Sequence, residues 1–124
     1  MQTAAQLGVE QFVEFIGPQD NPYPYMNACD IYVQPSRYEG HSVTVREAQM
    51  LYKPVVITNY NTAANQVQSG VDGIICELNN EAIANAIMEL ANNPKLYQSI
   101  ANYLRCHDYG NEQEVYKIYQ LLCI

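Results

Sequence analysis

Short apolar runs alternate with amphipathic stretches along the chain, most regularly over residues 30–58. Residues 30–34 and 54–58 are short apolar runs of the kind that form buried strands. Between them lie a glycine-containing loop at 35–42 and a segment at 43–51 whose apolar residues recur at helical spacing. A strand, a loop, a helix and a second strand in this order predict one βαβ unit with parallel strands.

The rest of the chain continues the alternation of strands with helices. Residues 11–16 predict a further buried strand, and Asn21 is the expected cap of a helix at 22–29. The other expected elements are a strand at 74–77 and helices at 1–7, 63–68, 81–91, 94–105 and 112–122. We therefore predict the fold class α/β, with a parallel sheet and helices on both of its faces.

Composition limits the classes of protein to which this chain can belong. Its 124 residues, of which 48% are hydrophobic and 15% are charged, are enough for one globular core. A formal net charge of −7 argues against a nucleic-acid partner, because nucleic acid attracts basic surfaces. No apolar run approaches the ~20 residues that span a bilayer, and no signal peptide is recognisable. We expect a cytoplasmic protein without a transmembrane segment.

The cysteines give the same indication about the compartment. Cys29, Cys76, Cys106 and Cys123 are far apart, and their spacing does not match that of metal ligands. We expect Cys29 and Cys76 to be small core residues, and we expect neither a zinc site nor a catalytic thiol. Free cysteines are typical of a reducing cytoplasm.

Two carboxylates bracket the start of the helix predicted over 43–51. Glu39 lies in the loop and Glu47 in the helix, with Gly40 at the approach to the helix N-terminus. Backbone N–H groups at a helix N-terminus lack intrahelical partners, and the helix dipole adds partial positive charge there. An anion such as a phosphate is therefore favoured at this end. Carboxylates on either side would accept hydrogen bonds from hydroxyls, which suits a nucleotide-sugar.

A structural interpretation of the same residues stands beside this one. Thr44 and Glu47 have the T-x-x-E spacing of a capping box, in which the two side chains satisfy amides at the helix start. Glu39 would then be a solvated loop residue. Glu47 can also cap the helix and bind a ligand at the same time.

The sequences at 36–40, 46–48 and 53–56 together resemble the nucleotide-sugar-binding domain of retaining glycosyltransferases of the family 4 type, which have the two-domain GT-B fold. The similarity extends over about residues 5–105. It implies that residues 1–124 are a partial C-terminal, Rossmann-like donor-binding domain. The activity it implies is transfer of a hexose from a nucleotide-diphosphate sugar to a glycan or lipid-linked acceptor, as in polysaccharide biosynthesis.

The chain also departs from the family pattern. Family members carry two strands that lie between the equivalents of 11–16 and 31–33 in the sheet, with an Arg and a Lys that hold the diphosphate, and we find no counterpart of them. The Gly-rich stretch ending in Pro-Glu is replaced at 58–66, which puts a role for that loop in doubt. We therefore expect residues 11–16 to lack normal strand partners, and a fragment without the acceptor-binding domain to be inactive alone.

The resemblance implies a role for each site residue. Glu39, the predicted catalytic residue, would contact a hydroxyl of the donor sugar, and Glu47 would accept hydrogen bonds from both ribose hydroxyls. The remaining donor contacts would come from the backbone: Gly40 allows close approach, His41 and Ser42 meet the sugar, Val43 and Thr44 meet the diphosphate, and Ile16 and Gly17 lie near the nucleobase.

The resemblance implies a nucleotide-diphosphate sugar as the ligand, with no cofactor and no metal. The absence of an Asp-x-Asp motif from the sequence fits this. The implied protein partner is the acceptor-binding domain, and the full enzyme would be free to associate peripherally with a membrane.

Two other functions stay open. One is a non-enzymatic α/β nucleotide-binding or regulatory module, although the strand ends at Gly17 and Gln34 lack the acidic cluster of receiver domains. The other is a nucleotide-sugar epimerase-like domain.

Overall fold

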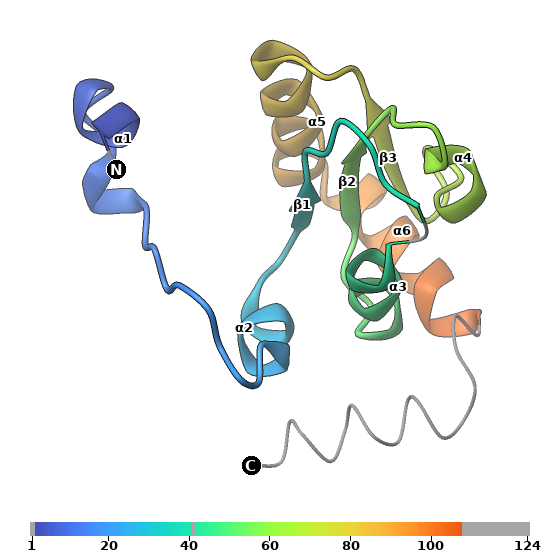
Figure 1. Cartoon of the computed structure of the whole chain (residues 1–124). Coiled ribbons are helices and arrows are strands. Elements are labelled where there is room, and N and C mark those ends of the chain that lie inside the picture. The colour runs from blue at the N-terminus through green and yellow to red at the C-terminus, as the bar shows by residue number, and fades with distance from the viewer. Residues whose placement is uncertain (1, 41, 108–124) are drawn as a thin grey trace.

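The computed structural model describes residues 2–40 and 42–107, so the helix predicted over 112–122 lies outside the described residues. Figure 1 shows the arrangement of the elements. In chain order they are α1 (Gln2–Gln6), the 3-10 helix η1 (Glu10–Phe12), α2 (Tyr23–Ala28), β1 (Tyr32–Gln34), α3 (Val43–Met50), β2 (Val55–Thr58), α4 (Ala63–Gln66), β3 (Gly73–Cys76), α5 (Asn80–Asn92) and α6 (Pro94–Cys106).

The three strands form one parallel sheet in the order β1-β2-β3, which confirms the predicted βαβ unit. Val33 of β1 lies opposite Val56 of β2, and Val56 lies opposite Ile74 of β3. All four residues of the central strand β2 are buried. A strand that is covered on both faces has no polar side, which explains the continuous apolar run in its sequence.

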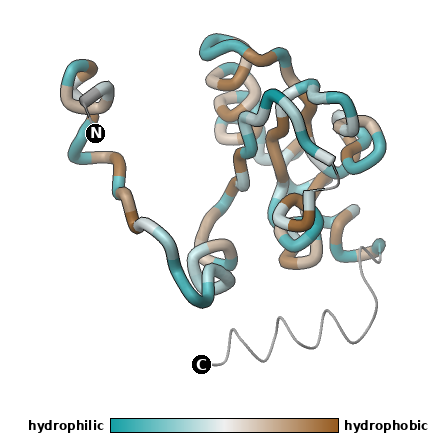
Figure 2. The backbone as a smooth tube through the Cα atoms, in the orientation of Figure 1, coloured by the Kyte–Doolittle hydropathy of each residue, from teal (hydrophilic) through white to brown (hydrophobic). Residues whose placement is uncertain are grey.

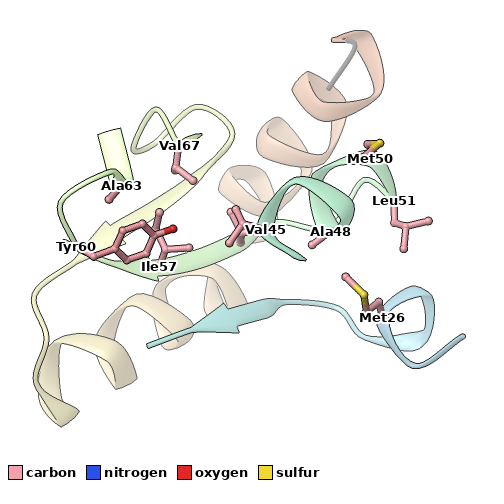
Figure 3. Packing of buried hydrophobic residues seen from close by; sticks show 10 residues of the cluster. Met26, Val45, Ala48, Met50, Leu51, Ile57, Tyr60, Ala63 and Val67 are labelled. Carbon is pink, nitrogen blue, oxygen red and sulfur yellow. The ribbon is translucent and has the colours of Figure 1, made fainter. Parts of the chain in front are cut away.

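Alternate residues of β2 belong to two separate hydrophobic cores. Val55 and Ile57 point into a cluster formed with α2, α3 and α4, whereas Val56 points into a cluster with α5 and α6. Figure 3 shows the first cluster, in which Val45 of α3 lies beside Ile57. Val45, Val55 and Ile57 have no exposed surface. Helices therefore cover both faces of the sheet, as predicted for an α/β fold.

The prediction of a buried strand at 11–16 is wrong. Residues 10–12 form η1, and residues 13–19 are neither helix nor strand. Phe12 is 79% exposed and Phe15 is 62% exposed. In Figure 1 this segment runs well apart from β1. In Figure 2, the same segment contains apolar stretches and has no other element beside it. Among the described residues, β1 pairs with β2 alone, and the segment 13–19 takes no part in the sheet.

Local signals placed most of the other elements correctly. The predicted cap of α2 is one residue off: Pro22 occupies the cap position, and the Asn21 side chain before it accepts a hydrogen bond from the N–H of Tyr23 at 3.3 Å. Cys29 and Cys76 are only partly buried, so they lie at the margin of the core, and burial raises the pKa of both thiols. Within the described ranges, no helix combines the length and the apolar character that crossing a membrane requires.

Candidate functional site

The loop between β1 and α3 ends at Ser42, which caps the helix. The Ser42 Oγ accepts a hydrogen bond from the N–H of Val45 at 3.3 Å, and Ser42 itself is buried. The helix therefore begins at Val43, and Glu47 is its fifth residue rather than its third. The capping box of Thr44 and Glu47 is wrong for this reason, which leaves the Glu47 carboxylate without a capping role.

The carboxylate of Glu39 is held by neighbouring side chains. Its Oε1 accepts hydrogen bonds from Gln34 Nε2 at 3.0 Å and from Ser36 Oγ at 2.7 Å. Thr62 Oγ1 donates to the backbone oxygen of Glu39 at 3.0 Å. Glu39 is half-buried, so the interpretation of it as a solvated loop residue is wrong. A carboxylate in a fixed orientation can present its second oxygen to a ligand hydroxyl.

Glu47 is half-buried on α3 and interacts with Tyr23 of α2. Burial raises the pKa of Tyr23 to about 12, together with a hydrogen bond to Glu47 and the negative charge of that carboxylate. A raised pKa keeps the phenol neutral, and a neutral phenol can donate a hydrogen bond to the carboxylate. Tyr23 therefore orients Glu47 from the side of α2.

The charges of both carboxylates act on the phenol of Tyr32 in β1. The pKa of Tyr32 is raised chiefly by burial; a hydrogen bond to Thr44 lowers it, and the charges of Glu47 and Glu39 raise it further. Burial and the charge of Glu39 likewise raise the pKa of Tyr60. Hydrogen bonds of Gln34 join Glu39 to Ser42 and Thr44 at the start of α3, the helix that carries Glu47. The roles of the two carboxylates stay predictions.

Only some of the residues that were predicted to contact the donor through their backbone lie at the start of α3. Val43 is 64% exposed and Thr44 is exposed, whereas Ser42 and Val45 are buried, so the first turn of α3 is open to solvent on one side. Gly40 does not use a positive φ, and a Cβ built there would meet no atom within 4 Å, so its backbone borders open space. His41 lies outside the described residues.

Ile16 and Gly17 are not brought to this site. They lie in the extended segment between η1 and α2, where Ile16 is 41% exposed, and Figure 1 shows that segment running apart from α3. Their contact with a nucleobase stays a prediction.

The loop is also braced by the last residue of β2 and by two residues of the segment that follows it, none of which is among the predicted site residues. Thr58 Oγ1 donates to the backbone oxygen of Ser36, and Gln66 Nε2 donates to that of Ser42 at 2.7 Å. Together with Thr62 on Glu39, these side chains bind every third carbonyl of the loop. Polar residues directly after a buried strand were the available signal, because the carboxyl ends of neighbouring parallel strands meet at one edge.

A separate hollow of about 580 Å³ contains none of the predicted site residues. It lies along the segment 64–69 of α4 and the turn that follows, and it is completed by Arg46, Asp72 and Ile75. It offers an alternative place for a ligand.

The Tyr23–Glu47 contact predicts a pH dependence of stability. The folded-state pKa of Tyr23, about 12, is above its unfolded value of 10.0, so the contribution is present below pH 10 and is lost as the pH rises toward 12. The free energy of unfolding should therefore fall more steeply over this range in the wild type than in Tyr23→Phe. Urea titrations at several pH values measure this, and identical pH profiles for the two proteins would contradict it.

The sequence matches a known protein family over most of its length. Residues 2–107 match the family model described as Glycosyl transferases group 1. An uncharacterized glycosyltransferase of Haemophilus influenzae is 33% identical over 114 residues, which are 89% of this chain and 32% of the relative. The chain therefore spans about a third of the length of this relative.

Two solved structures have the same fold. The structure of Anabaena HepE in complex with UDP has a TM-score of 0.82 and 26% identity, covering 98% of this chain and 34% of that one. The C-terminal domain of LpcC, a glycosyl transferase group 1 protein from Francisella tularensis, has a TM-score of 0.69 and 22% identity, covering 96% and 57%. From the family match and these folds, the chain belongs to the glycosyl transferases group 1 family and corresponds to part of its C-terminal GT-B domain.

Proposed function

We propose that this chain is the donor-binding part of a retaining glycosyltransferase of hexosyltransferase type, which moves a sugar from a nucleotide-diphosphate sugar to a glycan or lipid-linked acceptor. The observation that carries the proposal is the open N-terminus of α3 between two held carboxylates, Glu39 and Glu47. The family match favours a transferase over both the regulatory module and the epimerase.

Each part of a nucleotide-sugar has a matching group at this site. The amides of Val43 and Thr44, at the positive end of the helix dipole, suit the diphosphate. The same amides would stabilise the negative charge that develops on the diphosphate as the sugar leaves. Glu47 would accept hydrogen bonds from the ribose hydroxyls, and Glu39 would accept one from the donor sugar.

Uridine diphosphate is the first ligand to test, because the similar structure of Anabaena HepE was solved in complex with UDP. The chain covers about a third of the Haemophilus influenzae relative, and we propose that the acceptor site lies outside the residues of this chain. We therefore expect the chain to bind a donor nucleotide without transferring the sugar. We also propose that the sugar transfer needs no metal ion and takes place in the cytoplasm.

Calorimetric titration of the chain with UDP tests the proposal. UDP should bind, and uridine should bind far more weakly because it has no phosphate to meet the α3 amides. Binding of UDP should persist in excess chelator. A folded chain, verified by circular dichroism, that binds neither UDP nor UDP-glucose at millimolar concentration would refute the proposal.

A further inference from the structure

The side-chain amide of Gln34 makes four hydrogen bonds at the end of β1. Its Nε2 donates to Glu39 Oε1 at 3.0 Å and to Ser42 Oγ at 2.8 Å. Its Oε1 accepts from the Tyr32 hydroxyl at 2.8 Å and from Thr44 Oγ1 at 3.0 Å. A primary amide offers two donated protons and two lone pairs, so all of its hydrogen-bonding capacity is used.

These contacts fix the orientation of the amide. If the amide were rotated by half a turn, its oxygen would face the Glu39 carboxylate, and two acceptors would oppose each other. In the observed orientation, the partners of Gln34 come from three places: Tyr32 on β1, Glu39 in the loop, and Ser42 and Thr44 at the start of α3.

The hydrogen bond to Ser42 connects Gln34 with the start of α3. Ser42 Oγ accepts a hydrogen bond from Gln34 Nε2 and a second one from the N–H of Val45. Any change that moves the Gln34 amide therefore acts on the Glu39 carboxylate and on the cap of α3 together. Hydrogen bonds arranged in one network share such displacements.

We propose that Gln34 is a positioning residue that couples the carboxylate for the donor sugar, on Glu39, to the amides that receive the diphosphate at the start of α3. This inference rests on the proposed function. Gln34 holds the two subsites at a fixed separation, so a ligand that fills both gains from that preorganisation. A ligand that fills the α3 end alone gains less.

Gln34 also differs from the neighbouring strand residues in what it contacts. Val33 packs against the hydrophobic cluster that β2 and β3 form with α5 and α6, whereas Gln34 belongs to neither core cluster. Replacing Gln34 therefore removes hydrogen bonds to the site without opening a cavity in the core. This separates a positioning role from a packing role.

The test compares the affinities of UDP-glucose and UDP for the wild type, Gln34→Leu and Gln34→Glu by calorimetry. Gln34→Leu removes all four hydrogen bonds, and Gln34→Glu keeps the shape but loses both donors and faces Glu39 with a like charge. Each variant should bind UDP-glucose at least about tenfold more weakly, the effect of a hydrogen bond to a charged group. The affinity for UDP should fall by a smaller factor, so the preference of the variants for UDP-glucose over UDP should be smaller than that of the wild type.

Gln98→Leu is the control, because Gln98 is exposed on α6 and its Nε2 donates only to Asn102 within the helix. It should bind both ligands as the wild type does. If Gln34→Leu fails to fold, the nearly isosteric Gln34→Glu decides. A wild-type chain that binds both ligands, with an unchanged preference in the folded Gln34 variants, would overturn the coupling alone. A wild-type chain that binds neither ligand would overturn the proposed function and this inference together.

Discussion

Replacing Glu47 by glutamine is expected to lower the affinity of the chain for UDP by at least about tenfold, because hydrogen bonds to a charged group contribute about 1.5–3 kcal/mol. The carboxylate would accept from two ribose hydroxyls, and an amide offers only one accepting oxygen. Since Ser42 rather than Glu47 serves the amides of the first turn, the substitution should leave the cap of α3 intact. Calorimetry gives the affinity, and thermal unfolding verifies the fold.

Two controls separate this effect from a general loss of charge. Glu89→Gln changes an exposed carboxylate on α5 and should leave UDP binding unchanged. A uridine diphosphate without ribose hydroxyls should bind the wild type and Glu47→Gln about equally. If Glu47→Gln bound UDP as tightly as the wild type, the ribose role of Glu47 would be wrong.

Replacing Gly73 by alanine is expected to lower the free energy of unfolding by about 1–3 kcal/mol, the usual cost of overpacking a core. A Cβ at this position would lie 2.6 Å from Val55 Cγ2, 2.8 Å from the backbone oxygen of Val55 and 3.0 Å from Val67 Cγ1. Val55 belongs to the buried central strand, so β3 must move away from it. Urea denaturation measures the change.

Gly40→Ala is the matched control for Gly73→Ala. Gly40 has no positive φ, and its added Cβ meets no atom within 4 Å. Its stability should therefore stay within about 0.5 kcal/mol of the wild type, as is usual for substitutions that disturb no packed contact. Equal stabilities for Gly73→Ala and Gly40→Ala would show that the contact between β2 and β3 is looser than the structure indicates.

The βαβ unit and the two carboxylates were predictable because their signals are local. A buried strand, a glycine-containing loop and an amphipathic helix each leave a short pattern in the sequence, and a parallel unit orders them in space. Glu39 and Glu47 follow from that order, since the loop after β1 and the start of α3 must meet at the same edge of the sheet. The hydrogen bonds of Gln34 to Glu39, Ser42 and Thr44 agree with this order.

The strand at 11–16 and the capping box failed because each depends on information outside the pattern. An apolar run becomes a strand only when a neighbouring strand satisfies its backbone, and none of the described strands reaches residues 13–19. The cap depended on where the helix begins. Ser42 and Thr44 are both good caps by type, and the fold uses Ser42.

The supports of the site were the least predictable part. Gln34 is a single polar residue at the end of a strand, without a spacing that indicates four hydrogen bonds. Thr62 and Gln66 lie where the chain departs from the family pattern, so the resemblance put a role for their loop in doubt. Both donate to backbone oxygens of the site loop, and the sequence separations of these contacts are 23 and 24. Contacts between segments so far apart leave no local pattern in the sequence.

An NMR titration of the isotopically labelled chain with UDP shows whether the nucleotide binds at the start of α3. We expect the amide signals of residues 42–45, at the start of α3, to shift most and to saturate together, and we expect Glu47→Gln to weaken this response. Shifts confined to the hollow around Gln68, Ser69 and Asp72, with no change at 42–45, would contradict this expectation.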